Sequence, residues 1–245
     1  MEDRIERIRD SERRSHTEIY ESEKLYCTNS WLSKPINTVK EIVPIFSDYT
    51  SFRALDLGAG IGRNSIFIAK EFKDKACSID CVDLLEIAID KLDQNAVEHG
   101  VEKSINGIVK AIEDYEILPD TYDLTMVISA LEHSDSEGSF IRILKQICAG
   151  TKDNGVVCLV INSEVNEVNA ATGEALDPQF EVNLPAAEID NILDRIFQDW
   201  KVIKRTVVDQ EYVIPRDDIQ SRLTTKVITF VAQKGDRRCQ RKKSQ

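Results

Sequence analysis

Apolar positions recur along this chain with two periods after residue 50, and these periods predict strands and helices in alternation. Short apolar runs bounded by turn residues are typical of strands, and apolar residues at helical spacing are typical of amphipathic helices. Such alternation favours a parallel, doubly wound sheet with helices on both faces. The pattern predicts strands at 54–57, 77–82, 105–111, 122–128 and 155–161, and helices after residue 62 and at 84–99, 136–149 and 186–197.

The last part of the chain breaks this alternation. Two β-rich runs at 200–213 and 223–233 follow each other with no helix between them, so we expect a hairpin. Residues 162–185 make a long connection before the last helix. Long loops in compact domains are commonly functional, and we assign this one to substrate selection, with an ordinary surface insertion as the alternative.

Three glycines stand at alternate positions directly after the first predicted strand, at Gly58, Gly60 and Gly62. Glycine adopts backbone conformations closed to other residues, and without a Cβ it lets a ligand lie against the main chain. The turn is therefore interpreted as a ligand cradle, with a tight strand-to-helix turn as the alternative. The dinucleotide fingerprint would need its last glycine at Arg63, which weakens the nicotinamide interpretation.

Asp83 ends the second predicted strand, about 20 positions after the glycine turn. An acidic residue at this place can accept hydrogen bonds from both hydroxyls of a ribose. The alternative is a helix N-cap, because aspartate is favoured there in any protein.

The run 122–133 combines a nearly continuous apolar segment, typical of a central buried strand, with a polar exit. That exit, from Ser129 to His133, would lie at the carboxyl end of the sheet, where open α/β folds bind ligands. His133 is a candidate acid or base, because imidazole titrates near neutral pH.

The pattern of Asp56 followed by the three glycines is similar to motif I of the class I S-adenosylmethionine-dependent methyltransferases, and the run 122–133 resembles their fourth-strand motif. The resemblance covers residues 51–234 and implies a Rossmann-like, seven-stranded doubly wound sheet with an antiparallel last strand, in the order 3-2-1-4-5-7-6. It implies S-adenosylmethionine as the cofactor and makes His133 a wall of its pocket as an alternative to catalysis. The cofactor-binding residues implied are Tyr26, Trp31, Asp56, Gly58, Gly60, Gly62, Asn64, Asp83, Leu84, Ile112, Glu113 and Ser129.

The position after the third strand is where many class I enzymes carry an acidic residue for the adenine amino group. Here Ala111 occupies it, and Ile112 could offer its backbone N–H to the ring. Glu113 or Asp114 could take the amino group, or could simply be charges that begin a helix.

The segment 62–69 looks like the G-R-N-S-hydrophobic-aromatic run of the tellurite-resistance methyltransferases, which methylate tellurium, selenium and thiol species. That family carries a His-Arg pair before the last strand, whereas this chain has Pro215-Arg216. The catalytic residues therefore stay unassigned, and the weak candidates are His133, Arg216 and Arg222.

The resemblance predicts an enzyme that transfers a methyl group to a small molecule, with a thiol or chalcogen such as tellurite or selenite as the leading acceptor. A sulfonium methyl is already activated, so a soft acceptor needs positioning and exclusion of water rather than a base. One alternative is an oxygen or nitrogen methyltransferase for a small metabolite, which would need a general base. Another is a non-catalytic methyltransferase-like binding domain.

Residues 1–50 precede the methyltransferase-like region and are highly charged over their first half. In this superfamily such a segment often forms a helical lid, in which Tyr20, Tyr26 and Trp31 would close over the sulfonium cation. The alternative is a helix that packs against the sheet.

The composition and charge of the chain limit the kinds of partner, location and cofactor that we expect. A net charge of -11 makes nucleic acid an unlikely partner, because phosphate contacts need a basic surface. No apolar stretch reaches membrane-spanning length and the first residues lack the apolar core of a signal peptide, so we expect a cytoplasmic protein. The six cysteines lack metal-binding spacing, so we expect reduced thiols and no metal. The basic segment 235–245 is expected to be a disordered tail, and the sequence does not predict an oligomeric state.

Overall fold

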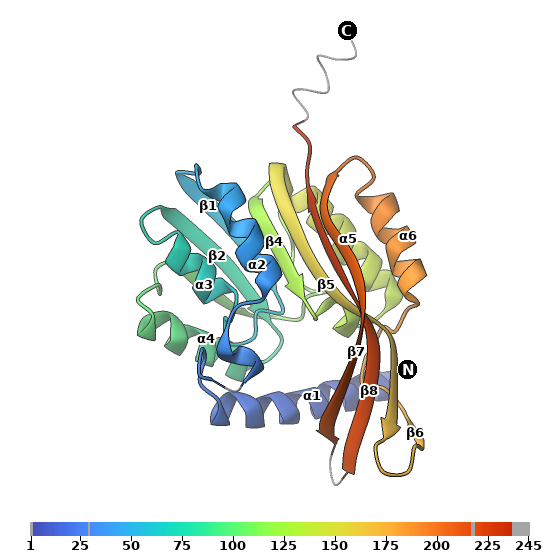
Figure 1. The fold of residues 1–245 in the computed structure, drawn as a ribbon. Helices are drawn as coiled ribbons and strands as arrows, with labels where there is room; N and C mark the ends of the chain where they lie inside the picture. Colours follow the sequence, from blue (N-terminus) through green and yellow to red (C-terminus); the bar gives the residue numbers. More distant parts are fainter. Residues whose placement is uncertain (1, 29, 217–218, 237–245) are drawn as a thin grey trace.

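The computed structural model describes residues 2–28, 30–216 and 219–236 (Figure 1). Its helical elements are α1 (Glu2–Ser22), η1 (Trp31–Ser33), α2 (Asn37–Ile42), η2 (Val43–Phe46), α3 (Ser65–Glu71), α4 (Glu86–Glu98), η3 (Leu131–His133), α5 (Glu137–Gly150) and α6 (Ala186–Ile196). Its strands are β1 (Ser51–Leu57), β2 (Ala76–Asp83), β3 (Ile105–Val109), β4 (Tyr122–Ile128), β5 (Thr151–Asn169), β6 (Ala175–Leu176), β7 (Lys201–Arg216) and β8 (Ile219–Gln233).

The strands form one mixed sheet in the order β3-β2-β1-β4-β5-β8-β7, and the short β6 pairs with β5. The first five strands pair in parallel, whereas β8 lies antiparallel between β5 and β7. Counted without β6, this order is the predicted 3-2-1-4-5-7-6, so the predicted Rossmann-like α/β fold is confirmed.

Two apolar clusters cover the two faces of the sheet, as the alternation of side chains along a strand requires. On β1, Ala54 packs into the cluster formed with α2, α3 and α4, and its neighbours Leu55 and Leu57 pack into the cluster formed with α5 and α6. Figure 1 shows these two groups of helices on opposite sides of the sheet. All three side chains are fully buried, which fixes the end of β1 where the glycine turn begins.

The predicted bounds of the fifth strand and of the loop that follows it were wrong. Residues 162–169, expected to begin a loop, continue β5, which is therefore much longer than the predicted strand at 155–161. Polar residues remain in the strand because β8 supplies an antiparallel partner for their backbone groups, pairing Ser163 with Lys226 and Asn166 with Thr224. An irregularity between Ser163 and Asn166 bends the strand.

The helix α1 runs across the edge at which the parallel strands end (Figure 1). Four of its side chains line the same cavity as the glycine turn after β1 and Asp83 at the end of β2. The amino-terminal segment is therefore helical, as expected, and lies where a lid would lie; its function as a lid stays a prediction.

Within the described residues, no helix is long and apolar enough to cross a membrane. Five cysteines fall in that part of the chain and all are free thiols, with Cys81 and Cys158 buried and Cys27 exposed. The predicted disordered tail falls mostly on residues 237–245, which lie outside the described residues.

Candidate active site

The glycine turn after β1 adopts a left-handed backbone that favours glycine. Gly58, Gly60 and Gly62 have φ of +77°, +53° and +89°. A Cβ on Gly58 would lie 2.3 Å from the Cβ of Ala130, so the turn and the exit of β4 approach each other too closely for a side chain. The N–H groups of Gly58 and Ala59 donate to the Val82 carbonyl at 2.8 and 3.0 Å, which holds the turn against the end of β2.

Asp83 links this turn to the helix that follows β2. Its Oδ2 accepts the Gly60 N–H at 2.8 Å, and its Oδ1 accepts the Leu85 N–H at 3.0 Å. Burial raises the pKa of this carboxyl, and the backbone N–H groups of Leu85, Gly60 and Leu84 oppose the shift. Each carboxylate oxygen has a second acceptor position, so Asp83 keeps capacity for ligand hydroxyls.

A cavity of about 430 Å³ lies at the carboxyl ends of β1, β2 and β4, and α1 lines one side of it. This volume falls within the range of small-molecule sites, which is about 300–1,000 Å³. Predicted cofactor residues line it together with His133, namely Trp31, Gly58, Gly60, Asn64, Asp83, Leu84, Ile112, Glu113 and Ser129.

Three predicted cofactor residues are not among the side chains that line this cavity. Asp56 is buried beneath the turn, where it accepts the Ser65 hydroxyl at 2.5 Å. Gly62 packs against α4, because a Cβ there would lie 2.3 Å from Leu92 Cδ1. The Tyr26 hydroxyl donates to the Arg63 carbonyl at 2.8 Å. These groups support the turn from behind rather than face the cavity.

Arg216 and Arg222, the two arginine candidates for catalysis, lie on the β5–β8–β7 ribbon and not among the residues that line the cavity. Arg216 donates from Nε to Glu167 Oε1 at 2.9 Å and from Nη2 to Glu167 Oε2 at 2.5 Å. Glu167 is fully buried, so this pair holds strands together. Arg222 is exposed on β8.

Polar residues that the sequence analysis did not single out also line the cavity. Arg9, Glu12 and His16 of α1 share one helix face with Tyr20, and Glu181 comes from the connection before α6. Their spacing of three or four positions indicates in the sequence that they share a helix face. The isoleucines of the same segment also have helical spacing, so spacing alone does not show which face lines a cavity. Glu181 offers no such signal, because a contact with a distant segment holds it in place, where the N–H of the adjacent Val182 donates to the Glu132 carbonyl at 2.9 Å.

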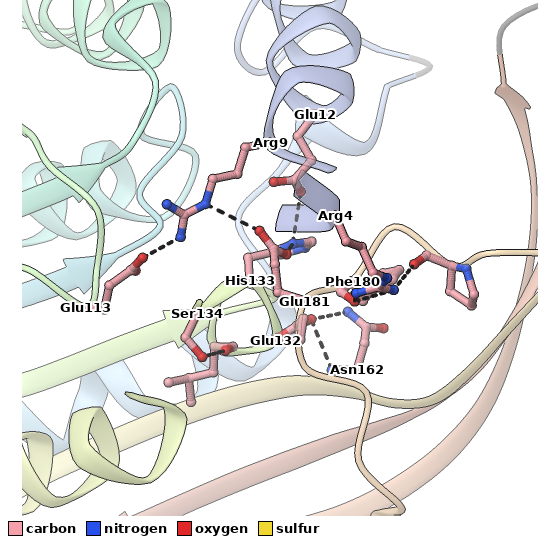
Figure 2. Close-up of polar contacts among 12 residues, drawn as sticks. Arg4, Arg9, Glu12, Glu113, Glu132, His133, Ser134, Asn162, Phe180 and Glu181 are labelled. Atoms are coloured by element: carbon pink, nitrogen blue, oxygen red, sulfur yellow. Dashed lines mark hydrogen bonds and ion pairs between the residues drawn. The ribbon is translucent and has the colours of Figure 1, made fainter. Parts of the chain in front are cut away.

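We call Glu12, His133 and Glu181 the carboxylate–histidine cluster. Both carboxylates lie at the same ring nitrogen, with His133 Nδ1 3.1 Å from Glu12 Oε1 and 3.0 Å from Glu181 Oε2. Figure 2 shows Arg9 beside the cluster, where it pairs with Glu113 and places Nε 3.5 Å from Glu181 Oε1. The cluster therefore joins α1, η3 and the connection before α6.

Burial and charge act in opposite directions on these groups. Burial lowers the pKa of His133, but the carboxylates of Glu12 and Glu181 outweigh it and the pKa rises to about 9. Burial raises the pKa of Glu12 to about 7, against the attraction of His133. Burial lowers the pKa of His16 to about 4, so its imidazole is neutral at physiological pH.

Residues 54–155 match a family model described as "Methyltransferase domain". Among solved structures, TehB from Haemophilus influenzae shares the fold with a TM-score of 0.61 and 18% identity, over 84% of this chain and 64% of that chain. A SAM-dependent methyltransferase from Methanosarcina mazei has a TM-score of 0.59 and 14% identity, over 82% and 99%. The YcgJ protein of Bacillus subtilis has a TM-score of 0.57 and 14% identity, over 81% and 98%. No curated protein matches the sequence.

Proposed function

We propose that this chain is an enzyme that uses S-adenosylmethionine and transfers its methyl group to a small molecule held in the cavity that α1 lines, because residues 54–155 match a methyltransferase domain. The observation that carries the proposal is the cavity itself. It lies at the carboxyl ends of the parallel strands and is lined by Gly58, Gly60 and Asp83. Ligands of open α/β folds bind at this edge.

The residues present fit the cofactor. Asp83 would accept the ribose hydroxyls, because its oxygens are fixed by Gly60 and Leu85 and keep free acceptor positions. Gly58 and Gly60 would let the amino-acid part of the cofactor approach the backbone. Leu84 and Ile112 would supply apolar walls for the adenine.

The bound cofactor supplies a methyl group already activated by a sulfonium. The chain's own residues therefore have to position the acceptor and exclude water. Tyr20 and Trp31 line the cavity from the amino-terminal segment, and aromatic faces suit a sulfonium cation. This supports the lid as a further part of the proposal.

Two acceptor classes follow. A thiol or chalcogen acceptor is supported by the run 62–69, and it requires no base. A specific observation favours an oxygen or nitrogen acceptor as the second candidate, because Glu12 lines the cavity and burial raises its pKa to about 7, which suits a general base. The cytoplasmic location stays a prediction.

The cofactor assignment is tested by calorimetric titration with S-adenosylhomocysteine, with NAD as the control ligand. Wild-type protein should bind the former alone. Asp83→Ala should weaken binding by about 1–3 kcal/mol, the value of a hydrogen bond to a charged group. Asp83→Asn keeps the shape of the side chain and removes its charge, so it measures the contribution of the charge by itself. Asp90→Ala, at an exposed position on α4 that does not line the cavity, should bind as wild type.

Unchanged affinity in folded Asp83→Ala protein would remove the ribose assignment. No binding of S-adenosylhomocysteine to folded wild-type protein would refute the proposed function. Release of S-adenosylhomocysteine is then measured with thiols, selenite and tellurite, and with hydroxyl and amine compounds. Binding without turnover on the whole panel would favour the non-catalytic domain.

A further inference from the structure

We propose that Glu12, His133 and Glu181 form a binding site for a divalent first-row transition metal ion, with zinc or manganese as the expected occupant. One ligand atom from each residue lies within 4.8 Å of the others. The residues come from three separate segments, and all three line the cavity. The sequence analysis predicted no metal, because it considered only the spacing of the cysteines.

The first argument concerns the number of hydrogen bonds that the histidine nitrogen can donate. Two carboxylate oxygens lie 3.1 and 3.0 Å from His133 Nδ1, yet a ring nitrogen carries a single proton and cannot donate at full strength to both. A cation at the centre would satisfy all three ligand atoms at once. Ligand atoms about 2.0–2.2 Å from a tetrahedral ion lie about 3.4 Å apart, so small side-chain rotations would suffice.

The second argument concerns buried carboxylate oxygens. The Glu181 side chain is 1% exposed, and its Oε1 has no hydrogen-bond partner among the described residues, only the 3.5 Å ion pair with Arg9. Glu132 lies behind the cluster, also 1% exposed, and its Oε2 likewise lacks a hydrogen-bond donor in the described part of the chain. Buried charged oxygens without donors are costly, and a nearby cation offsets that cost.

The local charge also favours a dication. Glu113 and Glu132 adjoin the cluster, which brings the carboxylates to four, and Arg9 is the cation that faces them (Figure 2). A histidine that binds a metal ion is neutral, so a dication would offset two of the three negative charges that remain on this wall of the cavity. His16, one turn after Glu12 on α1, lines the same cavity, and its Nδ1 has no hydrogen-bond partner among the described residues.

The kinds of ligand atom, one imidazole nitrogen and two carboxylate oxygens, indicate which metal ion would bind. Imidazole suits zinc, iron and nickel, whereas carboxylates suit manganese and magnesium, so one nitrogen with two carboxylates favours zinc or manganese. Three protein ligands with open coordination positions are typical of catalytic rather than structural metal sites. Those open positions would face the cavity, where an acceptor oxygen or sulfur could bind. Only this last role rests on the proposed function; metal binding itself does not.

The test is calorimetric titration of the full chain, treated with EDTA and dialysed, with Zn²⁺ and separately with Mn²⁺, at mildly alkaline pH and without cofactor. We expect one equivalent to bind. Glu12→Gln and Glu181→Gln keep side-chain size and should weaken binding by about 10-fold or more. Glu6→Gln, an exposed position on α1, should bind as wild type.

Failure of both ions to bind folded wild-type protein would overturn the proposal. Equal affinity in wild type, Glu12→Gln and Glu181→Gln would also overturn it, because the ion would then lie elsewhere, for example at a thiol. Mn²⁺ has little preference for thiolates, which excludes the cysteines as the source of its signal. Binding of S-adenosylhomocysteine in the presence of EDTA is measured separately, so the two proposals fail independently.

Discussion

Substitution of Gly58 by alanine should destabilise the fold by about 2–5 kcal/mol, and the structure separates two contributions to this cost. The φ of +77° places an L residue in the left-handed region, which costs about 1–2 kcal/mol. The new Cβ would lie 2.3 Å from Ala130 Cβ. Ala130 is a buried methyl that can move only with its backbone, and overpacking of this kind costs about 1–3 kcal/mol.

A double-mutant cycle measures the second contribution by itself. The free energy of unfolding is determined by urea titration for wild type, Gly58→Ala, Ala130→Gly and the double variant. Ala130→Gly removes the opposing methyl, so the pair should show a coupling energy of about 1–3 kcal/mol. Gly100→Ala is the matched control, because φ is +67° there and no atom lies within 4 Å of the added Cβ. It should cost only the backbone strain.

Two results would refute this reasoning. If Gly58→Ala cost no more than Gly100→Ala, contact with Ala130 would not restrict the turn. If the cycle gave a coupling energy near zero, the cost would come from backbone strain alone. The circular dichroism spectrum of each variant shows whether it folds.

Two further predictions concern buried charges. Burial raises the pKa of Asp56 to about 6, above the ordinary value of about 3.9, so the folded state binds this proton more tightly than the unfolded chain. Wild type should therefore lose about 2–3 kcal/mol relative to Asp56→Asn as pH rises from about 4 to 7, and parallel pH profiles from urea unfolding would contradict this. Arg9→Ala leaves Glu113 without its ion-pair partner and Glu181 with His133 alone, and should weaken α1 docking by about 2–4 kcal/mol, seen as faster amide exchange in α1. Arg13→Ala removes only an exposed pair with Asp10, and equal exchange in the two variants would contradict the prediction.

The parts of the site that the sequence predicts are those fixed by neighbouring strands. Gly58, Gly60 and Asp83 come together because parallel strands present their carboxyl ends at one edge, so an order of elements is enough to place them. The turn residue Gly62 is recognised by the same pattern, but its role differs. It makes room for Leu92 of α4, a contact that spacing within the turn does not reveal.

The parts that the sequence does not predict depend on pairing between distant segments. Residues 162–169 have the polar composition of a loop and become strand because β8 lies alongside them. That pairing in turn sets the start of the connection that carries Glu181 to His133. Neither residue has a neighbour in sequence that indicates the other, so the carboxylate–histidine cluster appears only in three dimensions.

The docking of α1 also bears on the order in which the chain can fold. Arg4 pairs with Asp177, a separation of 173 positions, and Arg9 pairs with Glu113 and Glu181. Domains are synthesised from the amino terminus, so α1 leaves the ribosome long before its partners exist. The highly charged helix can stay solvated while the sheet assembles. These ion pairs of α1 can therefore form only after residues 113, 177 and 181 have been synthesised, so the wall of the cavity that α1 supplies is completed late.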